Sequence, residues 1–249
     1  MNLRRHASAV TVLILLLSWA PLPGPASGSE IDPTARQSME QVIEQYIRTH
    51  PEVIEQSLQT LEAKREAEER ARQKAALATH QHELFNDPTS PVSGNVAGDI
   101  TLVEFFDYRC GYCKRAAGAV TQLQQEDSRV RVVYKDFPIL GEASELAAKA
   151  ALASKAQGKH QVFHEALLAS KGDITKESIL VIAREVGLDT KRLEADMANP
   201  EWQKVIEMNR ALARSLGING TPGFIVGTEL VPGALDLNGL KELIARAGK

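Results

Sequence analysis

Two cysteines separated by two residues, Cys110-Gly-Tyr-Cys113, are the only cysteines in this chain of 249 residues, and they constrain its fold more than any other feature. The run DITLVEFFDY (99–108) that precedes them predicts a buried β-strand, and the residues from Cys110 to about Gln125 predict a helix. VRVVYKDF (130–137) predicts a second buried strand. A strand, a helix and a strand over so short a stretch indicate a β–α–β unit with two parallel strands.

A C-x-x-C pair can be a structural disulfide, half of a metal site or a redox pair. A disulfide that closes so small a loop removes little entropy from the unfolded chain, so it stabilises weakly. A tetrahedral metal site needs further Cys or His ligands, and there is no second C-x-x-C. A redox pair fits better, because the helix N-terminus favours the thiolate of Cys110. Cys113, one turn later, is expected to be more buried and to attack a mixed disulfide on Cys110.

The N-terminus predicts export. Arg4, Arg5 and His6 precede an apolar run from about Ala7 to Ala20, and small residues follow in APLPGPASGS. The run of about 14 residues is shorter than the roughly 17–25 residues of a membrane-spanning helix. We therefore interpret residues 1–28 as a cleaved secretory signal, with an uncleaved anchor as the alternative.

Residues 29–87 predict helices. Asp32-Pro33 is a typical helix start, and Pro51 is expected to break the helix at His50. Around this break, apolar residues at helical spacing form a stripe: Val42, Ile43, Tyr46, Ile47, Ile54, Leu58 and Leu61. No apolar partner for this stripe is evident nearby, so we expect residues 38–62 to associate with other subunits. Residues 62–78 are rich in charge, and their small apolar face (Ala67, Ala71, Ala75 and Ala78) predicts a solvated linker helix.

The remaining segment, 88–249, follows a turn-rich boundary, NDPTSPVSGN (86–95). After the β–α–β unit, residues 141–217 predict a series of helices. GTPGFIVGTELVPGA then predicts a hairpin of two short strands, and DLNGLKELIARAGK predicts a closing helix.

The segment VEFFDYRCGYC, the helical block before GTPGF, and the final hairpin and helix together resemble the DsbA superfamily over roughly residues 85–249. The long N-terminal helical extension and the CGYC sequence are most similar to ScsC-type proteins (suppressors of copper sensitivity) and related exported disulfide isomerases. The resemblance implies an α/β fold, a thioredoxin fold with an inserted helical bundle, and a periplasmic thiol:disulfide oxidoreductase that needs no bound cofactor or metal.

The resemblance also assigns roles to residues. It implies that Cys110 is the attacking cysteine and Cys113 the resolving one. It implies that Pro222, preceded by Thr221, is a cis-proline that faces the cysteines and helps to hold an extended substrate strand. Glu104, six residues before Cys110, matches the buried acid beneath the cysteines and is expected to relay a proton as Cys113 reacts.

Departures from the strong oxidases of the superfamily favour isomerase or reductase activity. Those oxidases have histidine where this chain has Tyr112, which cannot carry a positive charge, so we expect a less oxidising disulfide. Gly-Tyr between the cysteines and Thr221 before the proline both resemble the periplasmic isomerases. The resemblance further implies a homo-oligomer (trimer or dimer), secreted proteins with non-native disulfides as substrates, and a membrane thiol reductase of DsbD type as electron donor.

Two other functions stay open: a monomeric DsbA-like oxidase, and a protein that holds Cu(I) on its two thiolates, which are soft ligands. Nucleic-acid binding is not expected, because 29 basic and 32 acidic residues give a net charge of −3. His160 and His164 have the spacing of metal ligands on a helix, but without an evident third ligand we expect a surface pair. Met197 and Met208 are expected in the core.

Overall fold

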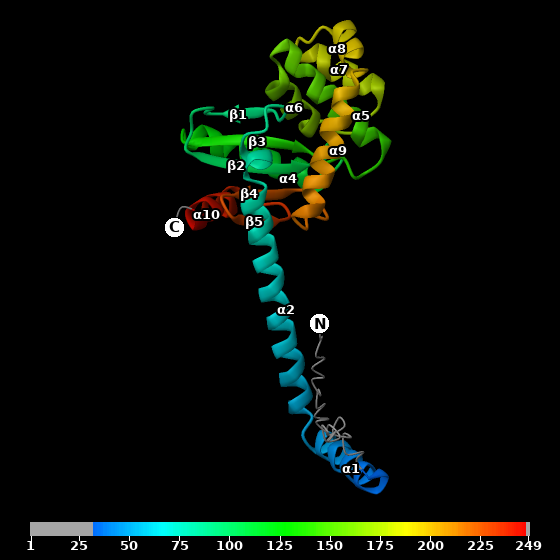
Figure 1. Ribbon diagram of the computed structural model, residues 1–249. Helices are drawn as coiled ribbons and strands as arrows, with labels where there is room; N and C mark the ends of the chain where they lie inside the picture. Colours follow the sequence, from blue (N-terminus) through cyan, green and yellow to red (C-terminus); the bar gives the residue numbers. More distant parts are fainter. Residues whose placement is uncertain (1–31, 248–249) are drawn as a thin grey trace, which may run out of the picture. The chain divides into compact units, whose positions relative to one another are not determined.

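The computed structural model describes residues 32–247, so the signal predicted at 1–28 lies outside the described residues (Figure 1). The chain divides into two compact units, with the boundary between Leu61 and Glu62. Within the described range, no helix combines the length and apolar character that crossing a membrane requires.

The first unit is helical and exposes its apolar side chains. Helix α1 (Pro33–Thr49) starts at Asp32, which caps it by accepting a hydrogen bond from the backbone of Thr34, and helix α2 (Glu52–Thr79) starts directly after Pro51. The break expected at His50 is therefore confirmed. None of the residues of α1 is buried. Met39 and the large apolar side chains of the stripe are exposed: Val42, Ile43, Tyr46, Ile47, Ile54, Leu58 and Leu61.

The second unit contains a five-stranded mixed sheet with the strand order β1-β3-β2-β4-β5. Its strands are β1 (Val92–Gly94), β2 (Ile100–Phe106), β3 (Val130–Asp136), β4 (Gly223–Val226) and β5 (Glu229–Pro232). β2 and β3 are parallel and are joined by helix α4 (Gly111–Glu126), while β4 and β5 form an antiparallel hairpin. The predicted β–α–β unit and hairpin are confirmed.

Strand β1 was not expected, because the segment 86–95 looked like a boundary. Val92–Gly94 pairs antiparallel with β3 at one edge of the sheet. The chain just before it is held by the buried Lys135, whose Nζ donates to Asp87 Oδ2 at 2.9 Å and to Ser90 Oγ at 2.7 Å. A strand of three residues is too short to show an alternating apolar pattern. The edge strand is instead held in place by the polar contacts of Lys135.

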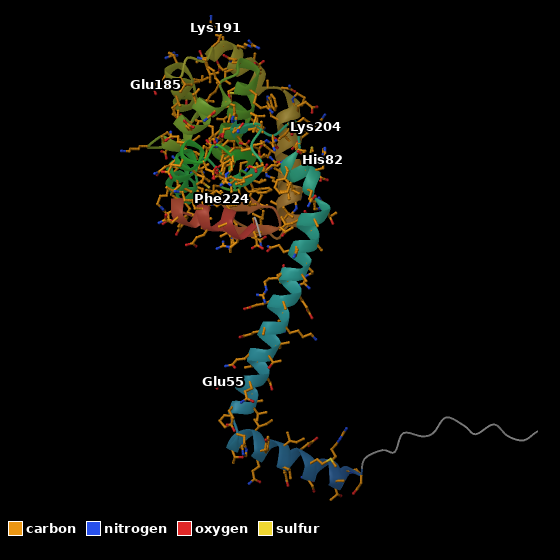
Figure 2. All side chains as sticks on the ribbon, turned by 90° about the vertical axis from the view of Figure 1, so that its left-hand side faces the viewer. Glu55, His82, Glu185, Lys191, Lys204 and Phe224 are labelled. Atoms are coloured by element: carbon orange, nitrogen blue, oxygen red, sulfur yellow. The ribbon has the colours of Figure 1, made fainter. Side chains whose placement is uncertain are left out.

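Helices cover the sheet and form the insertion expected at 141–217 (Figure 1). α4 contacts α6 and α10, and α5 contacts α6, α8 and α9. Charged residues of the insertion such as Glu185 and Lys191 lie at the surface, whereas Phe224 of β4 is fully buried (Figure 2). The remaining helices are α3 (Gln81–Phe85), α5 (Glu142–Ser154), a short 3₁₀ helix (Lys155–Gln157), α6 (His160–Ala169), α7 (Lys176–Glu185), α8 (Thr190–Met197), α9 (Pro200–Ser215) and α10 (Leu237–Ala247).

The end of α2 belongs to the core of this second unit. Leu77 and Leu84 are fully buried in one apolar cluster with Val103 and Phe105 of β2. Ala75 and Ala78 are exposed, as expected of a solvated linker helix, but Leu77 between them is buried. The packed unit thus reaches further towards the N-terminus than residue 88.

The two methionines expected in the core differ in their environment. Met197 packs against the main cluster, but 54% of Met208 is exposed. Its neighbours Val205, Ile206 and Asn209 form the buried face of α9, and Met208 lies outside this face. The prediction for Met208 was wrong.

Candidate active site at Cys110 and Cys113

Cys110 lies at the junction between β2 and α4. It is the N-cap residue of α4, with extended backbone angles (φ −72°, ψ 114°), and its side chain makes no capping hydrogen bond. The free N–H groups of the first helical turn and the positive end of the helix dipole therefore favour negative charge at this position. Only 8% of Cys110 is exposed, so a partner reaches its sulfur from one side.

Cys113 is fully buried one turn further into α4, and both cysteines are free thiols. Burial raises the pKa of the Cys113 thiol far above its ordinary value, and negative charge on Glu104 or Cys110 adds to this effect. At neutral pH the Cys113 thiol is protonated and shielded. Cys110 is therefore the sulfur that an incoming disulfide meets first.

Thr221 and Pro222 lie next to Cys110 in the structure, although they are far from it in the sequence. Because β2 and β4 are antiparallel neighbours, the residue pair just before β4 lies at the same sheet edge as the end of β2. The Thr221–Pro222 peptide bond is cis, and the Cys110 thiol donates a hydrogen bond to the Thr221 carbonyl oxygen at 3.2 Å. Three of the expected site residues are thus brought together.

Glu104 lies in the centre of the sheet, between Tyr134 of β3 and Phe224 of β4. Alternation along β2 puts it on the face that packs against α4 and Cys113. Its side chain is buried, and within residues 32–247 its Oε1 has no hydrogen-bond partner. Burial raises the pKa of Glu104 to about 8, so at neutral pH its carboxyl carries a proton.

Asp107 shapes the loop before Cys110, and our sequence analysis missed it. Its Oδ1 accepts the backbone N–H of Arg109 at 2.7 Å, and its Oδ2 accepts those of Ile139 and Leu140 at 2.8 and 3.0 Å. Its own carbonyl accepts the N–H of Cys110 at 3.0 Å. A buried aspartate directly after a strand was the available signal, since polar residues there often fix the following loop.

The residues that follow Cys110 shape the surface of the site. Tyr112 is 60% exposed, and the guanidinium of Arg115 lies 4.1 Å from the centre of its ring, a cation–π contact. Lys114 instead donates to the carbonyl of Ser170 at 2.8 Å. Arg115 is thus the basic residue of this segment that remains beside Tyr112.

A cavity of about 590 Å³, which we call the Pro222 groove, opens beside these residues. The cis-proline segment, the start of α4 and the β4–β5 hairpin supply most of its wall. The lining residues are Gln73, Tyr112, Arg115, Gly217, Ile218, Asn219, Gly220, Thr221, Pro222, Gly223, Leu230, Pro232, Gly233 and Ala234. Its volume is within the usual range of a binding site.

His160 and His164 are buried, which corrects the expected surface pair. The Tyr108 hydroxyl and His164 Nδ1 are 2.9 Å apart, and the ring of His164 lies against that of Tyr134, with centroids 4.2 Å apart and an interplanar angle of 43°. Burial lowers the pKa of both histidines, that of His164 to about 3, so they are neutral at pH 7. Between residues 32 and 247 no group of three or more His, Cys, Asp or Glu side chains could hold a metal ion.

Comparison with known protein families identifies both parts of the chain. Residues 101–245 match the family described as a DSBA-like thioredoxin domain. The chain belongs to the DsbA-like thioredoxin family. Residues 36–68 match the copper resistance protein ScsC N-terminal domain. A ScsC-type N-terminal domain is therefore followed by a DsbA-like thioredoxin domain, the combination that the sequence resemblance implied.

Solved structures agree with this assignment. A thioredoxin-like oxidoreductase from Silicibacter pomeroyi DSS-3 is 50% identical, covers 68% of this chain and 97% of its own, and superposes with a TM-score of 0.66. A linker-deletion mutant of Proteus mirabilis ScsC is 26% identical, covers 89% of this chain and 98% of its own, and has a TM-score of 0.67. The DsbA-like thioredoxin fold is thus confirmed.

The curated relatives are longer than this chain. The Na(+)/H(+) antiporter NhaA 1 of Salinispora arenicola is 28% identical over 166 residues, which is 64% of this chain but 26% of the antiporter. The chain therefore spans about a quarter of the length of that relative.

Proposed function

We propose that this protein is an exported thiol:disulfide isomerase or reductase that acts on secreted proteins with non-native disulfides. The observation that carries the proposal is the contact between the Cys110 thiol and the Thr221 carbonyl beside the cis Pro222 bond, with Cys113 buried behind. Cys110, an accessible sulfur at a helix N-terminus, suits attack on a substrate disulfide. Cys113, a shielded sulfur one turn later, suits release of the substrate.

In the proposed reaction, the Cys110 thiolate attacks one sulfur of the substrate disulfide. A bond forms between Cys110 and the substrate, and the other substrate sulfur leaves as a thiolate. That thiolate can attack a different disulfide of the same substrate, and the thiolate set free there then attacks the substrate sulfur bonded to Cys110, which completes the isomerisation and releases Cys110 as a thiolate. Alternatively, the Cys113 thiolate attacks Cys110 Sγ, which releases a reduced substrate and leaves a Cys110–Cys113 disulfide.

Glu104 is proposed to relay the Cys113 proton during that second attack: its carboxyl first gives up its own proton, and the carboxylate then takes the proton of Cys113. Its position on the same sheet face as Cys113, and a pKa of about 8, allow it to exchange a proton near neutral pH. Asp107 is a positioning residue, because its carboxylate holds the loop that carries Cys110.

Isomerase or reductase activity is favoured over oxidase activity by two features. Tyr112, between the cysteines, adds no positive charge that would stabilise the Cys110 thiolate and make the disulfide strongly oxidising. The exposed apolar stripe of α1 and α2 lies within the segment that matches the ScsC N-terminal domain, and it suits association of several chains. Several redox pairs in one assembly would help to rearrange a misbridged substrate.

The proposed organisation follows from these roles. Residues 1–28 direct export to the periplasm and are removed, residues 29–87 form an oligomerisation segment and linker helix, and residues 88–249 form the catalytic domain. Leu77 in the last turn of the linker helix, and Leu84 in the short helix α3 that follows it, belong to that domain's core. A membrane thiol reductase of DsbD type is the proposed electron donor that returns the Cys110–Cys113 disulfide to two thiols.

Cu(I) binding is a second candidate, favoured by the match to the copper resistance protein ScsC N-terminal domain. Two thiolates are suitable soft ligands for Cu(I). Copper analysis of anaerobically reduced protein tests it, because wild-type protein should retain Cu(I) and the Cys113→Ser variant should lose it. Equal retention by both would contradict binding at the cysteine pair.

The isomerase proposal is tested by reactivation of a scrambled-disulfide test protein. The reduced wild-type protein should restore activity, and Ile47→Lys should reduce this rate because it puts a charge into the apolar stripe. Gln45→Lys, the same charge on a polar position of α1, is the matched control. If the wild-type protein does not unscramble but rapidly oxidises a reduced substrate, it is an oxidase of the DsbA type.

A further inference from the structure

Gln73 of helix α2 lines the Pro222 groove, although it precedes the catalytic segment expected at 88–249. The other lining residues of the groove come from residues 112–234. One side chain of the linker helix is therefore part of the wall beside the candidate active site.

The position of Gln73 is fixed by its neighbours in α2. Leu77, one turn later, is fully buried in the cluster that includes Phe105, Leu212 and Leu216, and Ala76 packs against the same cluster. Side chains four residues apart lie on the same face of a helix. Burial of Leu77 therefore turns Gln73 towards the end of α9.

Direct contacts continue along this face. Gln73 Nε2 donates to the carbonyl oxygen of Leu216 at 3.4 Å. One turn earlier, Glu69 Oε1 lies 3.9 Å from the place that a Cβ on Gly217 would take. Leu216 and Gly217 lead directly into the segment that ends at Pro222. Helix α2 therefore runs beside the chain that carries the cis-proline.

The groove has a mostly apolar lining with few polar groups. Pro222, Leu230 and Pro232 line it together with the exposed ring of Tyr112, while Gln73 and Arg115 are among its polar side chains. Such a lining suits an extended polypeptide, with polar groups that select particular side chains. Because Gln73 donates through Nε2 to Leu216, its Oε1 remains available to accept a hydrogen bond from an occupant.

We propose that Gln73 is a specificity-determining residue, which contacts the polypeptide segment that flanks the reacting cysteine of a substrate. The proposal rests on the proposed function, because it deepens the substrate choice of the same site. The ligand class is an extended peptide, and the hydrogen-bonding side chain at position 73 selects among peptides by the polar or charged group near their cysteine.

The test compares two decapeptides, each joined to glutathione through a disulfide, with Lys or Glu two residues after the cysteine. Reduction consumes the two protein thiols and releases the peptide thiol and glutathione. The full-length chain with Gln73→Glu should raise the Lys-to-Glu ratio of rate constants about five-fold over wild type, and Gln73→Lys should lower it similarly. Gln81→Glu, the same change at an exposed site outside the groove, should leave the ratio within about two-fold.

Reduction of glutathione disulfide alone provides the second readout, and it should be nearly equal in all four proteins. An effect that is merely structural would slow both peptides and glutathione disulfide together, which would overturn the proposal. An unchanged peptide ratio in both charge variants would overturn it too. A wild-type protein that reduces none of the disulfides would overturn the proposed function itself, before any variant is compared.

Discussion

At the scale of single residues, the two sulfurs of the site differ because of where the helix starts. Cys110 is an N-cap residue that keeps a small exposed fraction of 8%, while Cys113 is fully enclosed by the core. Burial penalises the charged form of Cys113, so its thiol stays protonated in the reduced protein. The same four-residue stretch thus contains one reactive and one protected sulfur.

This difference predicts selective alkylation. At pH 7 iodoacetamide should modify Cys110 of the reduced, folded protein at least about 100-fold faster than Cys113, because the thiolate is the reacting species and Cys113 is neither exposed nor ionised. Mass spectrometry of digested samples measures both rates. In urea the two rates should converge. Equal rates in the folded protein would contradict the burial of Cys113.

Two buried carboxyl groups predict how stability depends on pH. Burial raises the pKa of both Glu104 and Asp136 to about 8, compared with ordinary values of 4.5 and 3.8. The folded protein therefore keeps protons that the unfolded chain releases above about pH 4.5. Their contribution to the free energy of unfolding is full below that pH and decreases as pH rises towards 8.

Replacing Glu104 by Gln should remove part of this dependence. Urea unfolding of the reduced protein should show that wild type loses stability between pH 5 and 8. The Glu104→Gln variant should lose roughly 3 kcal/mol less over the same range, with Asp136 supplying the remaining slope. The exposed Glu201→Gln is the control and should keep the wild-type slope. Equal slopes for wild type and Glu104→Gln would contradict a neutral, buried Glu104.

At the scale of elements, helix α2 changes character along its length. Its first part exposes Ile54, Leu58 and Leu61, whereas its end buries Leu77 in the thioredoxin core. The charged pattern of residues 62–78 conceals this change, because a single buried leucine follows four turns of polar residues. The end of α2 is therefore part of the DsbA-like unit and not only a connection to it.

A pair of identical substitutions tests this assignment. Leu77→Ala should lower the free energy of unfolding by about 2–5 kcal/mol, because it leaves a cavity against β2 and α9. Leu140→Ala, at a position outside the apolar stripe that is 43% exposed, should change it by less than about 1 kcal/mol. Denaturation in urea measures both. Similar small effects at the two positions would contradict the docking of the helix end.

The helices and strands that could be predicted are those with a clear pattern of apolar residues. β2, α4, β3 and the β4–β5 hairpin have apolar runs bounded by turn residues, and the break at Pro51 follows from the missing N–H of proline. β1 has only three residues and depends on the polar contacts of Lys135. No periodic signal marks such contacts, because they join parts of the chain that are far apart.

The residues of the candidate site also divide into those that a sequence pattern predicts and those that depend on contacts between distant parts of the chain. The cysteine spacing and the family resemblance predicted Cys110, Cys113, Thr221, Pro222 and Glu104 as site residues, whereas Asp107 and the proposed Gln73 were not predicted. Each missed residue acts through contacts with distant backbone groups, Asp107 with Ile139 and Gln73 with Leu216. The buried histidines were misjudged for a similar reason, since the aromatic neighbours of His164 come from β2, β3 and the loop after β2.

At the scale of the whole molecule, the apolar stripe of the N-terminal unit predicts self-association. Eight large apolar side chains are exposed there. Exposed apolar clusters of this kind commonly mark association surfaces.

A single charge in the stripe should weaken that association. Sedimentation of the wild-type protein should give the mass of two or more chains. Ile47→Lys should shift the equilibrium towards single chains, because it puts a charge into the apolar contact, whereas Gln45→Lys should not. A monomeric wild-type protein at micromolar concentration, or an unchanged mass for Ile47→Lys, would contradict the prediction.

The buried carboxyls also affect how the protein moves in an electric field. With Glu104 and Asp136 protonated at pH 7, each removes one negative charge, which brings the formal net charge of the chain from −3 to −1. The folded protein should therefore focus at a higher pH than its urea-unfolded form. An electrophoretic shift on unfolding would then report the two hidden protons directly, without any assay of the cysteines.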